Sequence, residues 1–166
     1  MDKREEGSEF TGLSREEIVA RFDEFIKTKE VPELIPLVDE LESAYNELLE
    51  ERKEAEKQKF LDEGGSEFDF VYHRDHADGK FAELHNLFKN RKEKFFEEKK
   101  TREHDNLASK QQVVTDLKNL IEKGDSVGKA FQQFRELRDR WKKIGDVPKK
   151  NEEQLESDYR HQRERF

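Results

Sequence analysis

Two histidines three residues apart, His73 and His76, are the side chains whose types and spacing come closest to a reactive site. On a helix this spacing places both imidazoles on one face, and Asp75 and Asp78 add carboxylates beside them, which are ingredients of a metal site. The sequence offers no identifiable third firm ligand. A histidine pair without the rest of a ligand motif is normally a surface or linker feature. We therefore expect no metal at this position and no cofactor elsewhere.

Other patterns that accompany catalysis are missing from the sequence. It has no cysteine, which excludes disulfides, thiolate metal sites and cysteine nucleophiles. Gly64-Gly65 lacks the lysine and the hydroxyl residue that complete a phosphate-binding loop. Paired carboxylates such as Glu97-Glu98 are frequent, but general acid–base catalysis needs a desolvated cleft rather than a solvated helix face. We expect that the protein is not an enzyme, and we identify no small-molecule substrate.

Basic residues are concentrated in two tracts of the C-terminal half. If the helices that carry these tracts pack together, the cations form one strip that can follow a phosphate backbone. Acidic residues such as Glu93 and Asp139 interleave with them, and this interleaving favours ion pairs within the protein over an acidic ligand. RNA fits the ligand alternative better than sequence-specific recognition of DNA, for which no motif is present. The residues of this basic strip are Lys89, Arg91, Lys92, Lys94, Lys99, Lys100, Arg135, Arg138, Lys142, Lys143, Lys149 and Lys150.

The composition predicts long exposed helices, because only 31% of the residues are hydrophobic and 45% are charged. The 13 phenylalanines argue against disorder, since disordered segments are poor in aromatic residues. No apolar run approaches the roughly 20 residues needed to span a bilayer. The first ten residues also lack the apolar core of a signal peptide. We expect a soluble, cytoplasmic protein with no membrane partner.

Charge is distributed unevenly along the chain, whose net charge is −8. Residues 1–70 carry 10 Lys+Arg against 22 Asp+Glu, whereas residues 71–166 carry 23 against 19. Such asymmetry indicates either that the acidic part packs beside the basic part or that each part meets a different partner. The first interpretation is the simpler one, and we favour it.

Apolar periodicity predicts a series of helices. Ser14 followed by Glu17 fits a capping box at the start of the first one. No proline or glycine lies between Gly79 and Gly124, which predicts one very long helix, followed by another over residues 126–144. The resulting segments are a flexible lead over residues 1–13, an N-terminal helical segment over 14–63, a linker over 64–79 and a helical hairpin over 80–166.

Trp141, the only tryptophan, lies on the apolar stripe of the helix over residues 126–144. We favour a core position for this stripe, the alternative being an interface that awaits another helix. Gly145 is placed to take a left-handed helix cap, and Pro148 prevents the helix from continuing. The stripe consists of Phe131, Phe134, Leu137, Trp141 and Ile144. The better candidates for partner contact are Phe10, Phe60, Phe68, Phe70 and Phe166.

This stripe and the residues that follow it resemble a bacterial family known as domain of unknown function 349, in the form found in Bacteroidetes-type sequences. The long-helix pattern from Phe81 to Leu107 is also similar, so the resemblance covers about residues 70–166. Asp146 and Glu156 depart from it, because the family usually has proline and tryptophan at these positions. The resemblance implies a helical hairpin that occurs in tandem in longer proteins, and it implies no known activity. It is carried by Phe131, Phe134, Leu137, Trp141, Ile144-Gly145 and Val147-Pro148.

These patterns together predict an all-α fold, an elongated antiparallel helical bundle or coiled-coil-like hairpin with one very long helix. We expect a non-catalytic helical interaction or scaffold module of a bacterial cytoplasmic protein. Its expected partner is a protein or further repeats of the same chain. The alternative is an RNA-binding or ribosome-associated module that uses the basic strip.

Overall fold

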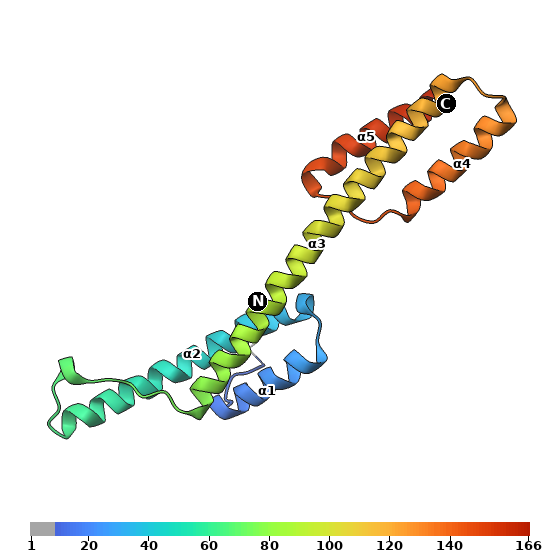
Figure 1. The fold of residues 1–166 in the computed structure, drawn as a ribbon. Helices are drawn as coiled ribbons and strands as arrows, with labels where there is room; N and C mark the ends of the chain where they lie inside the picture. Colours follow the sequence, from blue (N-terminus) through green and yellow to red (C-terminus); the bar gives the residue numbers. More distant parts are fainter. Residues whose placement is uncertain (1–8) are drawn as a thin grey trace, which may run out of the picture. The chain divides into compact units, whose positions relative to one another are not determined.

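The computed structural model describes residues 9–166, and the regular structure of these residues is entirely helical (Figure 1). The all-α class and the very long helix are therefore confirmed. None of the helices in the described part of the chain is both long enough and apolar enough to cross a membrane. The elements are α1 (Arg15–Thr28), α2 (Val31–Asp62), the short 3-10 helix η1 (Glu67–Asp69), α3 (His76–Lys123), α4 (Val127–Lys143) and α5 (Lys149–Arg165).

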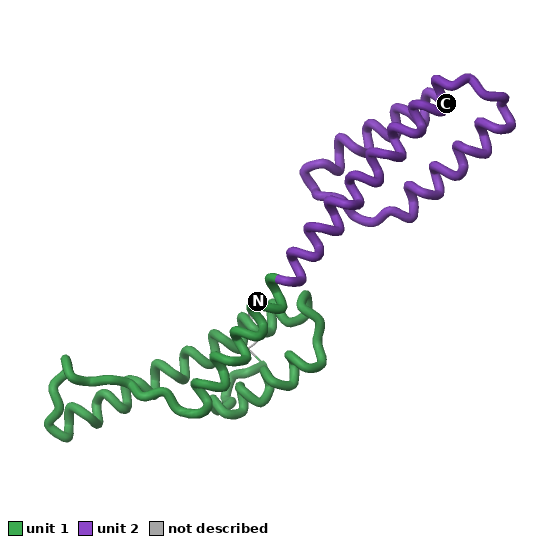
Figure 2. The backbone as a smooth tube through the Cα atoms, viewed as in Figure 1, with its two compact units in different colours: residues 1–93 green, residues 94–166 purple. Residues whose placement is uncertain are grey.

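The chain divides into two compact units whose boundary lies inside α3, unit 1 over residues 1–93 and unit 2 over residues 94–166 (Figure 2). The sequence suggested a division in the linker at residues 64–79 instead, because glycines interrupt the helical pattern there. The structure places that stretch within unit 1, since Asp75 bonds to Arg15 of α1 and Phe70 contacts Phe60 of α2.

The start of α1 follows the predicted capping pattern. The hydroxyl of Ser14 accepts a hydrogen bond from the backbone N–H of Glu17 at 3.1 Å, which satisfies one of the free N–H groups of the first turn. Just upstream, Phe10 is 1% exposed and its ring lies 6.0 Å from that of Phe25. Phe10 is thus a core residue of unit 1, although the sequence placed it in the predicted lead and among the candidates for partner contact. The rest of the predicted lead, residues 1–8, lies outside the described residues.

The core of unit 1 is shared by α1, α2 and the first part of α3. Tyr45 of α2 stacks on Phe81 of α3, with ring centroids 4.1 Å apart and planes at 9°. Phe22 of α1 meets the same Phe81 ring at 5.4 Å. Each large apolar side chain contributes about 1.5–3 kcal/mol when fully buried, so this shared cluster holds the three helices together. Its other fully buried members include Ile18, Leu34, Val38 and Leu41.

The connection from α2 to α3 is ordered by aromatic contacts. The ring of Phe60 lies 5.7 Å from that of Phe70. Gly65 makes room for Phe60, because a Cβ at this glycine would lie 2.3 Å from the phenylalanine ring. Phe68 in η1 is 97% exposed. Of the three phenylalanines predicted here for partner contact, Phe60 and Phe70 therefore cover each other, and Phe68 alone projects fully into solvent.

The N-terminus of α3 lies at His76, four residues before the predicted position at Lys80. The side chain of Asp75 accepts from the backbone N–H of Asp78 at 3.0 Å, and the side chain of Asp78 accepts from the N–H of Asp75 at 3.2 Å. This reciprocal arrangement is a capping box built from two aspartates. It starts the helix before Gly79, the residue that the sequence suggested as its break.

Unit 2 has a separate core made by the second part of α3 together with α4 and α5. Leu137 and Trp141 of α4 are buried there, and Phe134 and Ile144 are half-buried. Phe131 differs from its predicted core position, because it is 46% exposed. It therefore lies at the solvent-exposed edge of the α4 stripe. The other buried members of this core are Val113, Leu117, Leu120, Val147, Leu155 and Tyr159.

Gly145 serves close packing rather than a left-handed cap. The described glycines with positive φ are Gly12, Gly64 and Gly124, so the predicted conformation of Gly145 is wrong. A Cβ at Gly145 would lie 3.2 Å from the side-chain amide nitrogen of Asn106. That amide donates to the backbone carbonyl of Asp146 at 2.8 Å. The missing side chain thus lets the α4–α5 connection approach α3, and α5 begins directly after Pro148.

Candidate functional site

The two aspartates beside the histidine pair belong to a buried ion-pair cluster in unit 1. Arg15 donates to Asp78 at 2.7 Å and to Asp75 at 3.0 and 2.5 Å. Asp78 also accepts hydrogen bonds from the hydroxyls of Tyr45 and Tyr72. Arg15 is 7% exposed and Asp78 is 5% exposed. The cluster therefore joins α1, α2, the segment before α3 and α3 itself around one buried carboxylate.

The pKa shifts in this cluster follow from these contacts. The hydrogen bond from Arg15 holds the pKa of Asp75 well below its usual range. Burial acts to raise the pKa of Asp78, but the hydrogen bonds from Tyr45 and Tyr72 outweigh it and lower that pKa overall. Burial, and then the bond to Asp78, raises the pKa of Tyr72 to about 12. Both aspartates are charged at neutral pH and fully engaged by partners, which suits a structural clamp.

The histidine pair weighed as a possible metal motif takes no part in this cluster among the described contacts. His73 and His76 are exposed, and the two carboxylates next to them are bonded to Arg15. Within residues 9–166 no group of three or more His, Asp or Glu side chains is placed to hold a metal ion. The two aspartates nearest the histidine pair are instead bonded to Arg15.

The part of the basic strip in unit 1 is largely occupied by contacts within the unit. Arg91 donates to the backbone carbonyls of Ile26 at 2.5 Å and Lys29 at 3.3 Å, so it caps the end of α1. The Nζ atom of Lys92 lies 6.0 Å from the ring centroid of Phe88. Lys89 is exposed. Arg91 is therefore a structural residue, although the sequence grouped it with the ligand-binding cations.

The part of the strip in unit 2 is mostly exposed. On α3, Lys94 and Lys99 lie 3.9 Å from Glu98 and Glu103, one turn further along. Such exposed pairs contribute at most about 1 kcal/mol, so they do not hold the lysines firmly. Within the described part of the chain, the exposed strip residues of unit 2 that form no ion pair are Lys100, Arg135, Lys142, Lys143, Lys149 and Lys150.

A groove of about 460 Å³ between α4 and α5 brings four cations together. Arg138 and Lys142 line it from α4, and Arg160 and Arg163 line it from α5. The stacked rings of Trp141 and Tyr159 belong to the same groove, as does the carboxylate of Glu156. With four cations and one carboxylate, the lining of the groove is strongly positive.

The sequence pointed to only half of this basic groove. Arg138 and Lys142 were part of the predicted strip, whereas Arg160 and Arg163 were not. The sequence could have indicated these two arginines, because they follow Tyr159 by one and four residues in the last helix. Tyr159 belongs to the apolar face of that helix. This spacing places both arginines at the edge of the packed face, where they border any groove with the neighbouring helix.

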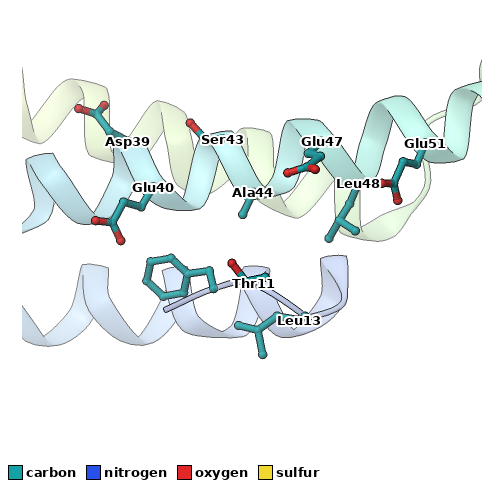
Figure 3. Close-up of a pocket in the computed structure, with 11 residues that line it drawn as sticks. Thr11, Leu13, Asp39, Glu40, Ser43, Ala44, Glu47, Leu48 and Glu51 are labelled. Carbon is teal, nitrogen blue, oxygen red and sulfur yellow. The ribbon is translucent and has the colours of Figure 1, made fainter. Parts of the chain in front are cut away.

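A second groove, of about 550 Å³, lies in unit 1 and has the opposite charge. Figure 3 shows carboxylates of α2 along one wall, with Thr11 and Leu13 along the other. Ala44 and Leu48 contribute its apolar part. The carboxylates that line it belong to Asp39, Glu40, Glu47 and Glu51.

Comparison with known families assigns the central part of the chain. Residues 78–150 match the model of the family described as Domain of Unknown Function (DUF349). These residues are a DUF349 domain. The resemblance seen in the sequence is thereby confirmed at the level of the family, over a shorter stretch than the expected residues 70–166. Neither a curated protein nor a solved structure matches the chain.

The DUF349 match covers α3 from Asp78 onward, all of α4 and the first residues of α5. The α4 wall of the basic groove, with Arg138 and Lys142, therefore lies inside the DUF349 domain. The α5 wall, with Arg160 and Arg163, lies beyond the matched residues. The groove is thus completed by side chains that the family match does not include.

Proposed function

We propose that this chain is a non-catalytic helical interaction module that binds a helical segment of a protein partner. The observation that carries the proposal is an apolar surface on unit 2 that the described residues leave uncovered. Val127 is 86% exposed, Phe131 is 46% exposed and Phe166 is 44% exposed. Grouped apolar side chains on a surface of this kind mark interaction sites in soluble proteins.

The spacing of these residues suits a helical ligand. Val127, Phe131 and Phe134 lie at steps of four and three residues, so they share one face of α4. Phe134 stacks on Phe166, the residue that follows α5, with ring centroids 4.5 Å apart and planes at 9°. The exposed face of α4 therefore continues onto the end of α5. An amphipathic helix with apolar anchors one turn apart can pack along such a face.

The shifted pKa values support binding rather than catalysis. Asp75 and Asp78 have lowered pKa values because both accept hydrogen bonds from Arg15, and Asp78 also accepts from two tyrosine hydroxyls. A catalytic acid or base must be free to exchange a proton with a substrate, whereas these carboxylates are held in ion pairs and hydrogen bonds within the protein. The cysteine-free composition also suits a reducing compartment, so we further propose that the module acts in the bacterial cytoplasm.

A photo-crosslinking residue at position 131 tests the proposal in the full chain. We expect ultraviolet light to join it to one discrete protein, and mass spectrometry to place the joined peptide in an amphipathic helix. The control places the same crosslinker at position 129, because exposed Lys129 lies about 160° around α4 from Phe131. Identical products at both positions, or no protein product at position 131, would contradict the proposal.

A further inference from the structure

We infer that the basic groove between α4 and α5 binds the phosphodiester backbone of a single-stranded nucleic acid. This site goes beyond the proposed protein-binding surface and uses different side chains. Its cations are Arg138 and Lys142 on α4 and Arg160 and Arg163 on α5. The two functions can therefore be tested separately.

The groove cations have little intramolecular neutralisation. Lys142 and Arg160 form no ion pair or hydrogen bond with any described residue. Arg138 lies 3.9 Å from Asp139, and both side chains are exposed, so water screens this pair strongly. Arg163 lies over the ring of Tyr159, 5.9 Å from its centroid, and keeps its charge. Most of the positive charge remains available to an external anion.

The carboxylate in the groove, Glu156, is paired with a lysine of α3. Glu156 lies 4.0 Å from the Nζ atom of Lys110, whose side chain is only 13% exposed. That ammonium also lies 4.5 Å from the ring centroid of Trp141. Because Lys110 offsets Glu156, the field in the groove is set by the two arginines of α5 and the two cations of α4. An approaching phosphate is attracted by all four.

The spacing of the cations suits a chain of phosphates rather than one isolated anion. Arg138 and Lys142 are four residues apart, which is about 6 Å along a helix, and Arg160 and Arg163 are about 4.5 Å apart. The two walls therefore present successive cations along the length of the groove. A guanidinium can bind a phosphate through two parallel hydrogen bonds, and three of the four cations are arginines. Beyond this groove, the unpaired lysines at the α4–α5 connection, Lys143, Lys149 and Lys150, extend the positive surface.

The shape of the groove favours a single strand bound through its backbone. The groove has a volume of only about 460 Å³, which is too small to admit a duplex. Trp141 and Tyr159 are 8% and 6% exposed and stack on each other. They therefore leave no open ring face on which a base could stack. We expect binding that depends on charge and is independent of base sequence.

Fluorescence anisotropy with labelled 20-mers of oligo(U) and oligo(dT) tests the site on the full chain. We expect both strands to bind at low salt, with an affinity that falls as salt rises. The double variant Arg160→Gln/Arg163→Gln should weaken binding by about tenfold or more and reduce the slope of log affinity against log salt by about 1.4. The matched control is Lys118→Gln/Lys129→Gln, which removes the same charge from exposed, unpaired positions of unit 2 outside the groove lining. It should leave the affinity nearly unchanged.

A variant of opposite sign separates the site from effects on folding. Glu156→Gln removes the one carboxylate among the described residues that line the groove and leaves the ammonium of Lys110 uncompensated beside it, so it should tighten binding severalfold. Misfolding cannot produce tighter binding. The inference is overturned if neither strand binds at low salt, or if both double variants weaken binding equally. It is also overturned if polyglutamate competes as well as oligo(U), because the groove then recognises an acidic polypeptide. A difference between oligo(U) and oligo(dT) would identify the sugar that the site prefers.

Discussion

Trp141 of α4 and Tyr159 of α5 stack face to face, with ring centroids 3.9 Å apart and planes at 6°. Both rings are buried, and Lys110 of α3 lies over the indole. Trp141 thus touches side chains from both neighbouring helices of unit 2. The basic residues around it in the sequence, such as Arg138 and Lys142, lie outside this contact and line the adjacent groove. The tryptophan is thus a packing residue, and in the proposed site the phosphate contacts belong to the cations.

Trp141→Ala should strongly destabilise unit 2. Removing a large buried aromatic ring costs about 3–5 kcal/mol, because the packing contacts are lost and a cavity remains. Trp141→Phe should cost less, since a smaller ring can still stack on Tyr159. Urea unfolding followed by circular dichroism measures the difference in free energy. If Trp141→Ala lowered the free energy of unfolding by less than about 1 kcal/mol, the indole would lie outside the core.

Phe131→Ser should have little effect on stability, in contrast to Leu137→Ala. Phe131 is 46% exposed and Leu137 is 8% exposed, although both were predicted to be core residues. We expect a cost of less than about 1 kcal/mol for the first variant and about 2–5 kcal/mol for the second. Both are measured by urea unfolding. If both variants lowered the free energy of unfolding equally, Phe131 would be as well packed as Leu137.

Arg15→Ala should destabilise unit 1 by about 3–5 kcal/mol, because it leaves the buried carboxylate of Asp78 without its cation. Arg52 supplies a matched control, since it also pairs with Asp75, at 3.1 Å, but its side chain is 38% exposed. Arg52→Ala should cost at most about 1 kcal/mol. Amide hydrogen exchange in α1 reports the loss of protection. If Arg15→Ala and Arg52→Ala destabilised unit 1 equally, burial of the ion pair would not explain its contribution to stability.

Unit 1 should lose stability in acid. The folded-state pKa values of Asp75 and Asp78 are lowered, so the stabilisation is present above the unfolded pKa of about 3.9 and is lost as pH falls toward the folded values. We expect urea midpoints that change little between about pH 7 and pH 5 and decrease below about pH 4. Asp75→Asn should be less stable at neutral pH and show a weaker acid dependence. Asp69→Asn, a change at an exposed aspartate without an ion pair, should retain the full dependence.

The sequence by itself determined the helices and several of their ends. Apolar residues at three- and four-residue spacing depend only on the helical period, and this local rule placed Leu137 and Trp141 on one face. Ser14 begins α1 through a hydrogen bond only three residues long, and Gly124 ends α3 with a positive φ. Such features need no information from distant parts of the chain, which is why they could be predicted.

Only the tertiary structure decided which edge of each stripe is covered and which charges meet. Arg15 bonds to Asp75 and Asp78 across 60 and 63 residues, and no local pattern links them. Phe10 is buried and Phe131 is exposed because the neighbouring helices cover the first ring and leave the edge of α4 open. Arg160 joins Arg138 in one groove for a similar reason, since α4 and α5 pack side by side. Helical periodicity specifies a face of each helix, but the partner of that face is set by packing between segments far apart in the sequence.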